Sequence, residues 1–138
     1  MASWRRKVLT WFPDLRSEAE RPDFTAYSAF LELRPRVAEA HLAGDTGTLR
    51  RIYGFAERCA RQKDKDLWNA AGMAFYERLF DSHRSLWPEF VHWLSPRVIA
   101  DCMGLWESRL SADDVAEVRR LIAERRSPHH HEARDLTT

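Results

Sequence analysis

The sequence predicts an all-α protein, and three observations support this prediction. Apolar residues recur at spacings of three and four over most of the 138 residues, which is the period of helices packed on one side. Only five glycines are present and the six prolines are scattered, which leaves little turn chemistry for a many-stranded β fold. No Asn-Gly hairpin signal occurs. We therefore expect a compact array of about six or seven helices, with antiparallel hairpins stacked as an irregular bundle or a short HEAT-like solenoid.

The first predicted helix covers residues 24–42. Pro35 lies inside it and removes one backbone hydrogen bond, but the apolar phase continues on both sides, which predicts a single kinked helix. Gly44 is expected to end this helix. Its apolar stripe is expected at Phe24, Tyr27, Leu31, Ala38 and Leu42.

The second predicted helix opens between Asp45 and Thr48, and a third long helix follows the charged turn at residues 63–66. Arginines cover the outer face of the second helix, at Arg50, Arg51, Arg58 and Arg61. Its apolar face is expected at Leu49, Ile52, Tyr53, Ala56, Cys59 and Ala60. The third helix directs toward the core Leu67, Ala70, Ala71, Ala74, either Phe75 or Tyr76, and Leu79.

Three further helices are predicted in the last third of the chain. The apolar stretch 86–94 is a short helix with Pro88 in its first turn. Ser95 before Pro96 is the N-cap of the next helix, and Ser111, followed by Asp114, begins the last one as in a capping box. We expect one domain over residues 1–126 and a flexible tail over residues 127–138.

Bulk charge and cysteine usage restrict the compartment and the class of partner. The net charge is +1, so no global field attracts nucleic acid or an anionic membrane. Cys59 and Cys102 lie inside predicted helices without a CxxC spacing, which predicts free buried thiols in a reducing compartment. The apolar stretch after Arg5 ends at Phe12, too early for a signal peptide, so we expect a cytoplasmic protein.

Two glutamates occupy matching positions in a short internal repeat, Phe55-Ala56-Glu57-Arg58 and Phe75-Tyr76-Glu77-Arg78. Paired carboxylates support acid–base chemistry or bind a metal ion. The alternative is that Glu57 and Glu77 are structural, each held by a nearby arginine or a helix end, and the sequence leaves both open. No complete catalytic set is present, and we predict a non-enzymatic protein without cofactor or metal. The run His129–His131 offers no fixed geometry for a metal ion.

Charge is segregated along the chain. Residues 46–63 hold five basic residues and one acid, whereas residues 101–124 hold six acids and three arginines. Such surfaces steer a protein toward a protein partner, although solvated helix faces are charged in any case. The predicted partner-binding residues are Arg50, Arg51, Arg58, Arg61, Trp68, Asp113 and Asp114. Trp4 and Trp11, in an N-terminal segment expected to be poorly anchored, are further candidates.

The alternative function is a helical nucleic-acid-binding regulator. The four arginines of the second helix favour it, and the helices at 96–110 and 112–126 are similar in spacing to a helix-turn-helix. Asp113 and Asp114 would then begin the recognition helix and repel the phosphates. Binding of nucleic acid is therefore the weaker hypothesis.

Residues 11–80 resemble a family of small bacterial helical proteins catalogued only as a domain of unknown function. The resemblance is carried by Phe12-Pro13-Asp14-Leu15, Phe55-Ala56-Glu57, Asn69-Ala70 and Phe75-Tyr76-Glu77-Arg78-Leu79. It implies a non-enzymatic bacterial protein, with some members acting as immunity proteins that neutralise a toxin by binding it. Our prediction is therefore an immunity or antitoxin-like protein, monomeric or homodimeric, with a cognate toxin as its partner.

Overall fold

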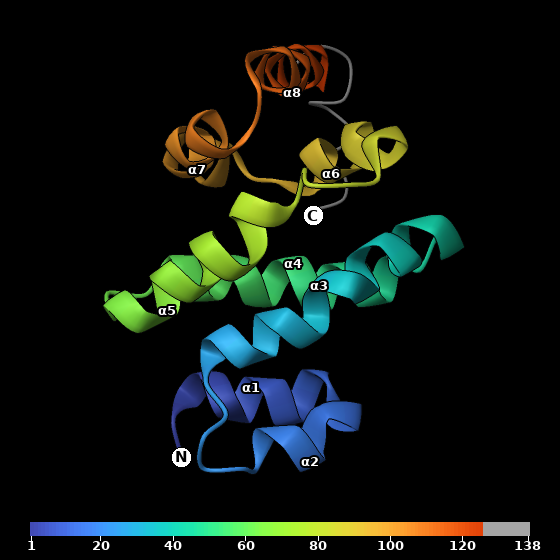
Figure 1. The fold of residues 1–138 in the computed structure, drawn as a ribbon. Coiled ribbons are helices and arrows are strands. Elements are labelled where there is room, and N and C mark those ends of the chain that lie inside the picture. Colours follow the sequence, from blue (N-terminus) through green and yellow to red (C-terminus); the bar gives the residue numbers. More distant parts are fainter. Residues whose placement is uncertain (126–138) are drawn as a thin grey trace. The chain divides into compact units, whose positions relative to one another are not determined.

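The computed structural model describes residues 1–125 and confirms the all-α class, with no strand in that range. The chain forms two compact units, Met1–Leu79 and a second unit that begins at Phe80 (Figure 1). The prediction of one domain over residues 1–126 stays a prediction, and the predicted tail at 127–138 lies outside the described residues. The eight α-helices of the described chain are α1 (Ser3–Trp11), α2 (Arg16–Ala19), α3 (Ala26–Ala43), α4 (Thr46–Ala60), α5 (Lys65–Asn69), α6 (Trp87–Trp93), α7 (Pro96–Arg109) and α8 (Ala112–Arg125).

The N-terminal segment is helical and anchored, which corrects the expectation of a poorly anchored segment. Arg5 on α1 donates hydrogen bonds to the carbonyl oxygens of Ala19 and Phe24, and its guanidinium also lies over the ring of Trp4. Val8 is fully buried. Because Arg5 satisfies the last carbonyl group of α2 and one in the loop after it, a single side chain fixes α1 against the chain that leads into α3.

Helix α3 lies within two residues of the predicted bounds and holds Pro35. Phe24 and Ala38 of the predicted apolar stripe are buried, but its other three residues are not. Tyr27, Leu31 and Leu42 are exposed by 41%, 46% and 71%. The buried face lies about a third of a turn away. It comprises Ala26, Ala29, Phe30, Leu33, Val37, Ala38, Ala40 and His41.

The ends of α3 and α4 follow from local side-chain and backbone chemistry, as predicted. Gly44 has a φ of 66°, the left-handed conformation that ends a helix and that glycine adopts without a Cβ penalty. The backbone N–H of Thr48 then donates to Asp45 Oδ1 at 3.1 Å, which caps α4. The turn between α3 and α4 is therefore specified by adjacent residues.

The predicted third helix departs from α-helical geometry after α5. A π-helical segment, η2 (Ala70–Phe75), continues into a 3₁₀ turn, η3 (Tyr76–Arg78). The N–H of Tyr76 bonds to the carbonyl of Ala71, five residues earlier. This wider turn places both Phe75 and Tyr76 in the core, with exposed fractions of 0% and 2%, where a regular helix was expected to bury one of them.

An aromatic cluster forms the core of the first unit. The ring of Phe30 lies 5.3 Å from that of Phe55 and 5.7 Å from that of Phe75. Phe12, in the turn before η1 (Pro13–Leu15), meets Phe55 edge-on at 6.0 Å. These contacts join α3, α4 and η2, which are separated by loops in the sequence.

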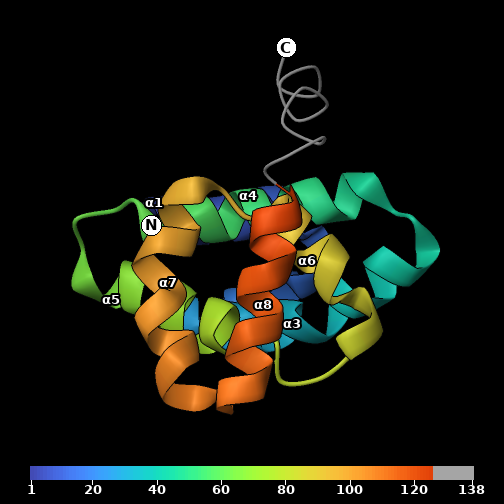
Figure 2. The ribbon, with the colours of Figure 1, turned by 90° about the horizontal axis from the view of Figure 1, so that it is seen from above.

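The second unit packs α8 against α6 and α7 (Figure 2). Its central side chain is Trp106, which is fully buried and meets Phe80 edge-on at 5.1 Å. Arg109 at the end of α7 forms two hydrogen bonds of 2.7 Å with the carboxylate of Asp81, which ties this helix to the start of the unit. Among residues 1–125, no helix is both long and apolar enough to cross a membrane.

Both cysteines are free and buried, as predicted. Burial raises the pKa of the Cys59 and Cys102 thiols to about 12, so almost no thiolate is present at neutral pH. Because the thiolate is the reactive form, we expect both residues to react with a disulfide reagent such as DTNB only after unfolding. Rapid labelling of two thiols in the native protein at pH 8, measured by absorbance, would contradict this burial.

Candidate protein-binding surface

The four predicted arginines of α4 share the face opposite the core. Their spacing places them on one side of the helix, whereas the buried side carries Leu49, Ile52, Phe55 and Cys59. Arg50, Arg51 and Arg58 are exposed, and Arg61 caps the C-terminal end. The structure therefore brings these four cations together on one solvent-facing side of the first unit.

Only part of this charge is neutralised within the molecule. Arg61 Nη2 donates to Glu57 Oε1 at 2.8 Å, and Arg51 Nη2 donates to Thr48 Oγ1 at 3.2 Å. Arg50 and Arg58 have no ion pair with any residue from 1 to 125. The α4 surface therefore presents at least two cations to a partner.

The two glutamates of the internal repeat, Glu57 and Glu77, have different surroundings. Glu57 is held by Arg61, which is the structural arrangement considered from the sequence. Glu77 lies half-buried in η3 and forms no ion pair within the described part of the chain. In residues 1–125, no three histidine, cysteine or acidic side chains gather as metal ligands, and His129–His131 lie outside that range.

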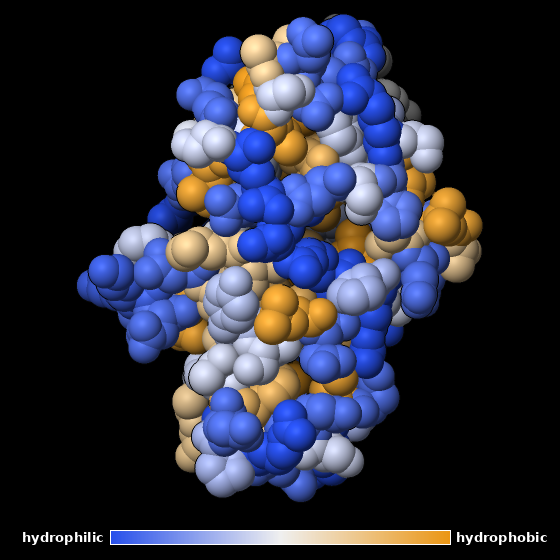
Figure 3. Space-filling model, viewed as in Figure 1, coloured by the Kyte–Doolittle hydropathy of each residue, from blue (hydrophilic) through white to orange (hydrophobic). Residues whose placement is uncertain are grey.

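Six large apolar side chains of the first unit are exposed; besides Met1 and Leu42, four lie on α3, α5 and η2. Tyr27 and Leu31 on α3, Trp68 on α5 and Met73 on η2 have exposed fractions between 41% and 48%. Figure 3 shows a small group of hydrophobic residues over the middle of α3, among hydrophilic side chains; its scale draws tyrosine and tryptophan pale. We call these four residues the apolar surface.

One hydrogen bond connects the parts of the apolar surface. Tyr27, Leu31 and Arg34 follow one flank of α3 at spacings of four and three. Arg34 Nη1 donates to the carbonyl oxygen of Ala74 at 3.2 Å, and α3 packs along η2. The exposed flank of α3 therefore adjoins η2 next to Met73, and the short helix α5 with Trp68 leads into the same segment.

The sequence alone suggested Trp68 but missed the rest of the apolar surface. The periodicity of α3 predicts Tyr27 and Leu31 in the core stripe of their helix. A signal was nevertheless present, because Ala26, Ala29, Phe30, Leu33 and Val37 form a second apolar stripe with regular helical spacing. A helix with two such stripes buries one and exposes the other.

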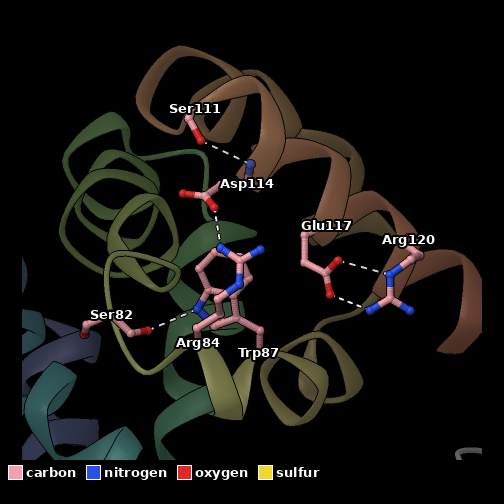
Figure 4. Close-up of polar contacts among 7 residues, drawn as sticks. All are labelled: Ser82, Arg84, Trp87, Ser111, Asp114, Glu117 and Arg120. Carbon is pink, nitrogen blue, oxygen red and sulfur yellow. Dashed lines mark hydrogen bonds and ion pairs between the residues drawn. The ribbon is translucent and has the colours of Figure 1, made fainter.

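The acidic candidates lie in the second unit, at the start of α8, and Figure 4 draws Asp114. Asp113 is exposed. Asp114 lies 2.5 Å from Arg84 Nη1, and the guanidinium of Arg84 lies 4.8 Å from the ring of Trp87. The backbone N–H of Asp114 donates to Ser111 Oγ, which confirms the predicted cap.

A second exposed pair follows one turn later on α8. Arg120 donates hydrogen bonds to both carboxylate oxygens of Glu117, which hold the pKa of Glu117 below its usual range (Figure 4). The acids of α8 are thus largely paired with arginines of the same unit. Among the predicted acidic contacts, Asp113 is the more available for a partner and Asp114 is held by Arg84.

Comparison with known sequences places the chain in a family. The sequence model described as "Domain of unknown function (DUF7674)" matches residues 5–122. The chain belongs to this family. No curated protein and no solved structure matches the chain.

The DUF7674 match extends well beyond residues 11–80, in which the resemblance was noted, and includes the helices α7 and most of α8. It confirms the expected membership of an uncharacterised helical family. The α4 arginines, the apolar surface and the acidic start of α8 all fall within the DUF7674 range. Both units therefore contribute to the family's sequence pattern.

The paired and unpaired aspartates of α8 give a test of stability. We expect Asp114→Asn to lower the free energy of unfolding by no more than about 1 kcal/mol, because its ion pair with Arg84 is partly exposed. Asp113→Asn, the matched control, is expected to change it by less than about 0.5 kcal/mol. Urea unfolding followed by circular dichroism measures both. A loss of several kcal/mol for Asp114→Asn would show that its pair with Arg84 is a main support of the second unit.

Proposed function

We propose that this protein acts by binding another protein, and that it is a bacterial immunity or antitoxin-like protein that neutralises a cognate toxin by direct contact. The observation that carries the proposal is the apolar surface. Tryptophan, tyrosine and methionine are enriched at protein interfaces, and three of its four residues are of these types. Large apolar side chains grouped in solvent are typical of contact surfaces.

The arginines of α4 supply the electrostatic part of the interaction. They lie opposite the buried face of α4, and Arg50 and Arg58 keep their charge uncompensated by any residue from 1 to 125. A cationic face accelerates association with an acidic partner and contributes less to the lifetime of the complex. We therefore propose a partner whose contact surface combines acidic residues with an apolar patch.

The toxin as partner and the bacterial cytoplasm as location rest on the sequence resemblance. Membership in a helical family of unknown function is consistent with both. An immunity protein needs no chemistry of its own, because it acts by occupying a surface of the toxin. The proposal therefore requires that this protein and the toxin form a stable complex of fixed stoichiometry.

The test begins with the neighbouring gene. We expect the protein encoded next to this one to co-purify with it and to form a complex whose dissociation constant is measurable by calorimetry. Trp68→Ala is expected to raise that constant about 30-fold, because truncation of a central aromatic contact typically costs about 2 kcal/mol. Leu31→Ala is expected to act in the same direction.

The control is Glu39→Gln, an exposed position on the same helix that lies off the apolar surface. It is expected to leave the dissociation constant unchanged. Arg50→Glu with Arg58→Glu is expected to slow association, most clearly at low salt. Tight, salt-sensitive binding of duplex DNA that disappears with the α4 arginines would instead establish the nucleic-acid-binding alternative.

A further inference from the structure

A cavity of about 470 Å³ opens in the first unit, away from the apolar surface. It lies where the end of α1 and the turn η1 meet α3 and α4. Its apolar wall consists of Trp11, Phe12, Pro13 and Ile52. Phe12 and Ile52 are buried, so this wall is continuous with the core, whereas Trp11 is half-buried at the opening.

Two arginines from different helices line the same cavity. Arg36 on α3 lies 2.6 Å from Asp14, which also lines it. Arg51 on α4 donates to Thr48 Oγ1 at 3.2 Å. Lys7 adds a third cation, with its Nζ atom 5.2 Å from the ring of Trp11.

The charges around the cavity do not cancel. Asp14 faces Arg36, and Asp45 at the cap of α4 lies in the field of Arg51. Of these groups, Asp14, Arg36 and Arg51 line the cavity, whereas Asp45 and Lys7 lie beside it. One positive charge is therefore left over, next to an aromatic and apolar wall.

Hydrogen-bonding capacity points to the same kind of ligand. The indole N–H of Trp11 has no acceptor within residues 1–125. Arg36 contacts Asp14 through Nη1, which leaves its other N–H groups available to a ligand. The hydroxyls of Thr10 and Thr48 already donate to other oxygens of the chain. The cavity is thus rich in unused donors, and its only carboxylate is already paired.

The cavity volume limits the size of the ligand. Pockets for small molecules usually measure about 300–1,000 Å³, so this one suits a single ring with a short substituent. A planar ring gains contact with Trp11 and the apolar wall. An attached carboxylate gains charge-assisted hydrogen bonds from arginine.

We propose that this cavity binds a carboxylate attached to an aromatic ring, offered either by a small aryl acid or by the C-terminal aromatic residue of a peptide. Arg51 and the free N–H groups of Arg36 bind the carboxylate, while Trp11, Phe12 and Ile52 contact the ring. None of the four residues of the apolar surface lines the cavity, whereas Arg51 lines it and also belongs to the α4 arginines of the proposed partner surface.

The experiment uses the ¹⁵N-labelled full chain and its indole N–H resonances, with Trp11 assigned from a Trp11→Phe variant. Phenylacetate is expected to shift the Trp11 resonance in a saturable manner. Phenylacetamide has the same shape without the charge, and acetate has the charge without the ring. Both are expected to bind with a dissociation constant at least about tenfold higher, because phenylacetamide lacks the charge and acetate lacks the ring.

The peptide Ala-Ala-Ala-Phe, with a free or an amidated C-terminus, shows whether the carboxylate comes from a peptide terminus or from a small aryl acid. Saturable binding of the free peptide but not the amide assigns the site to a chain terminus. Binding of phenylacetate without binding of the peptide assigns it to a small aryl acid.

The matched variants are Arg51→Gln, which removes a lining cation, and Arg50→Gln, its exposed neighbour outside the cavity. Arg51→Gln is expected to abolish the phenylacetate shift, while Arg50→Gln retains it, both with unchanged melting temperatures. Equal titrations by phenylacetate and its amide, equal losses in the two variants, or no saturable shift with any probe would overturn the proposal.

Discussion

Replacing Phe30 by alanine is expected to lower the free energy of unfolding by about 3–5 kcal/mol. Phe30 is fully buried, and its ring contacts both Phe55 and Phe75, so truncation leaves a cavity at the junction of three segments. Loss of the ring removes hydrophobic burial as well as two aromatic contacts. Urea unfolding monitored by circular dichroism measures the change.

The matched control is Tyr27→Ala on the same helix. Tyr27 lies three residues earlier and on the exposed flank, so its truncation is expected to change the free energy of unfolding by less than about 0.5 kcal/mol. A larger loss for Tyr27→Ala than for Phe30→Ala would show that the stripe predicted from the sequence, and not the stripe of Phe30, faces the core.

The same approach tests the prediction of one domain. Trp106 is the central buried side chain of the second unit, and Trp106→Ala is expected to cost about 3–5 kcal/mol there. In a single domain, Phe30→Ala and Trp106→Ala shift the same unfolding transition. Two transitions, each moved by only one variant, would establish two domains.

Lowering the pH from 7 to 4 is expected to remove up to about 3 kcal/mol of stability through His41 alone. Burial lowers the pKa of His41 to about 4, compared with the ordinary value of 6.5. Its Nε2 atom lies 2.9 Å from the Tyr53 hydroxyl, in the buried part of α3. The unfolded chain therefore binds a proton between pH 6.5 and 4 that the folded chain excludes.

The sign of the effect follows from this difference in proton binding. The contribution of neutral His41 to the free energy of unfolding is fully present above pH 6.5 and is lost as the pH falls from 6.5 to 4. Urea unfolding of the wild type and of His41→Gln at several pH values measures it. Other groups titrate in both proteins, so the difference between their pH profiles isolates His41. Parallel profiles would contradict a depressed pKa.

The sequence by itself determined the helices from residue 24 onward and most of their ends, because helix boundaries depend on neighbouring residues, but it did not predict α1 or α2. Gly44 ends α3, Asp45 caps α4, and Ser95 with Pro96 begins α7, all as predicted. The face of α4 was also predictable. Its arginines and apolar residues occupy opposite sides, so only one orientation buries the core and leaves the charges in water.

The candidate site could be predicted only in part. The α4 arginines and Trp68 are exposed as the sequence suggested, whereas Asp114 is held by an arginine thirty residues away in the chain. The cavity beside Trp11 was not predicted at all. Its lining residues come from three separate stretches of the chain, and local periodicity carries no information about which stretches meet.

The tertiary structure alone decided which stripe of α3 is buried and how the third helix ends. Tyr27 with Leu31, and Phe30 with Leu33, both have helical spacing, so the choice depends on partners that are distant in sequence. Phe55 and Phe75 contact Phe30, and this packing fixes the rotation of α3. The π-helical turn at η2 brings Phe75 and Tyr76 into the core together, because a wider turn allows two successive aromatic residues to face inward.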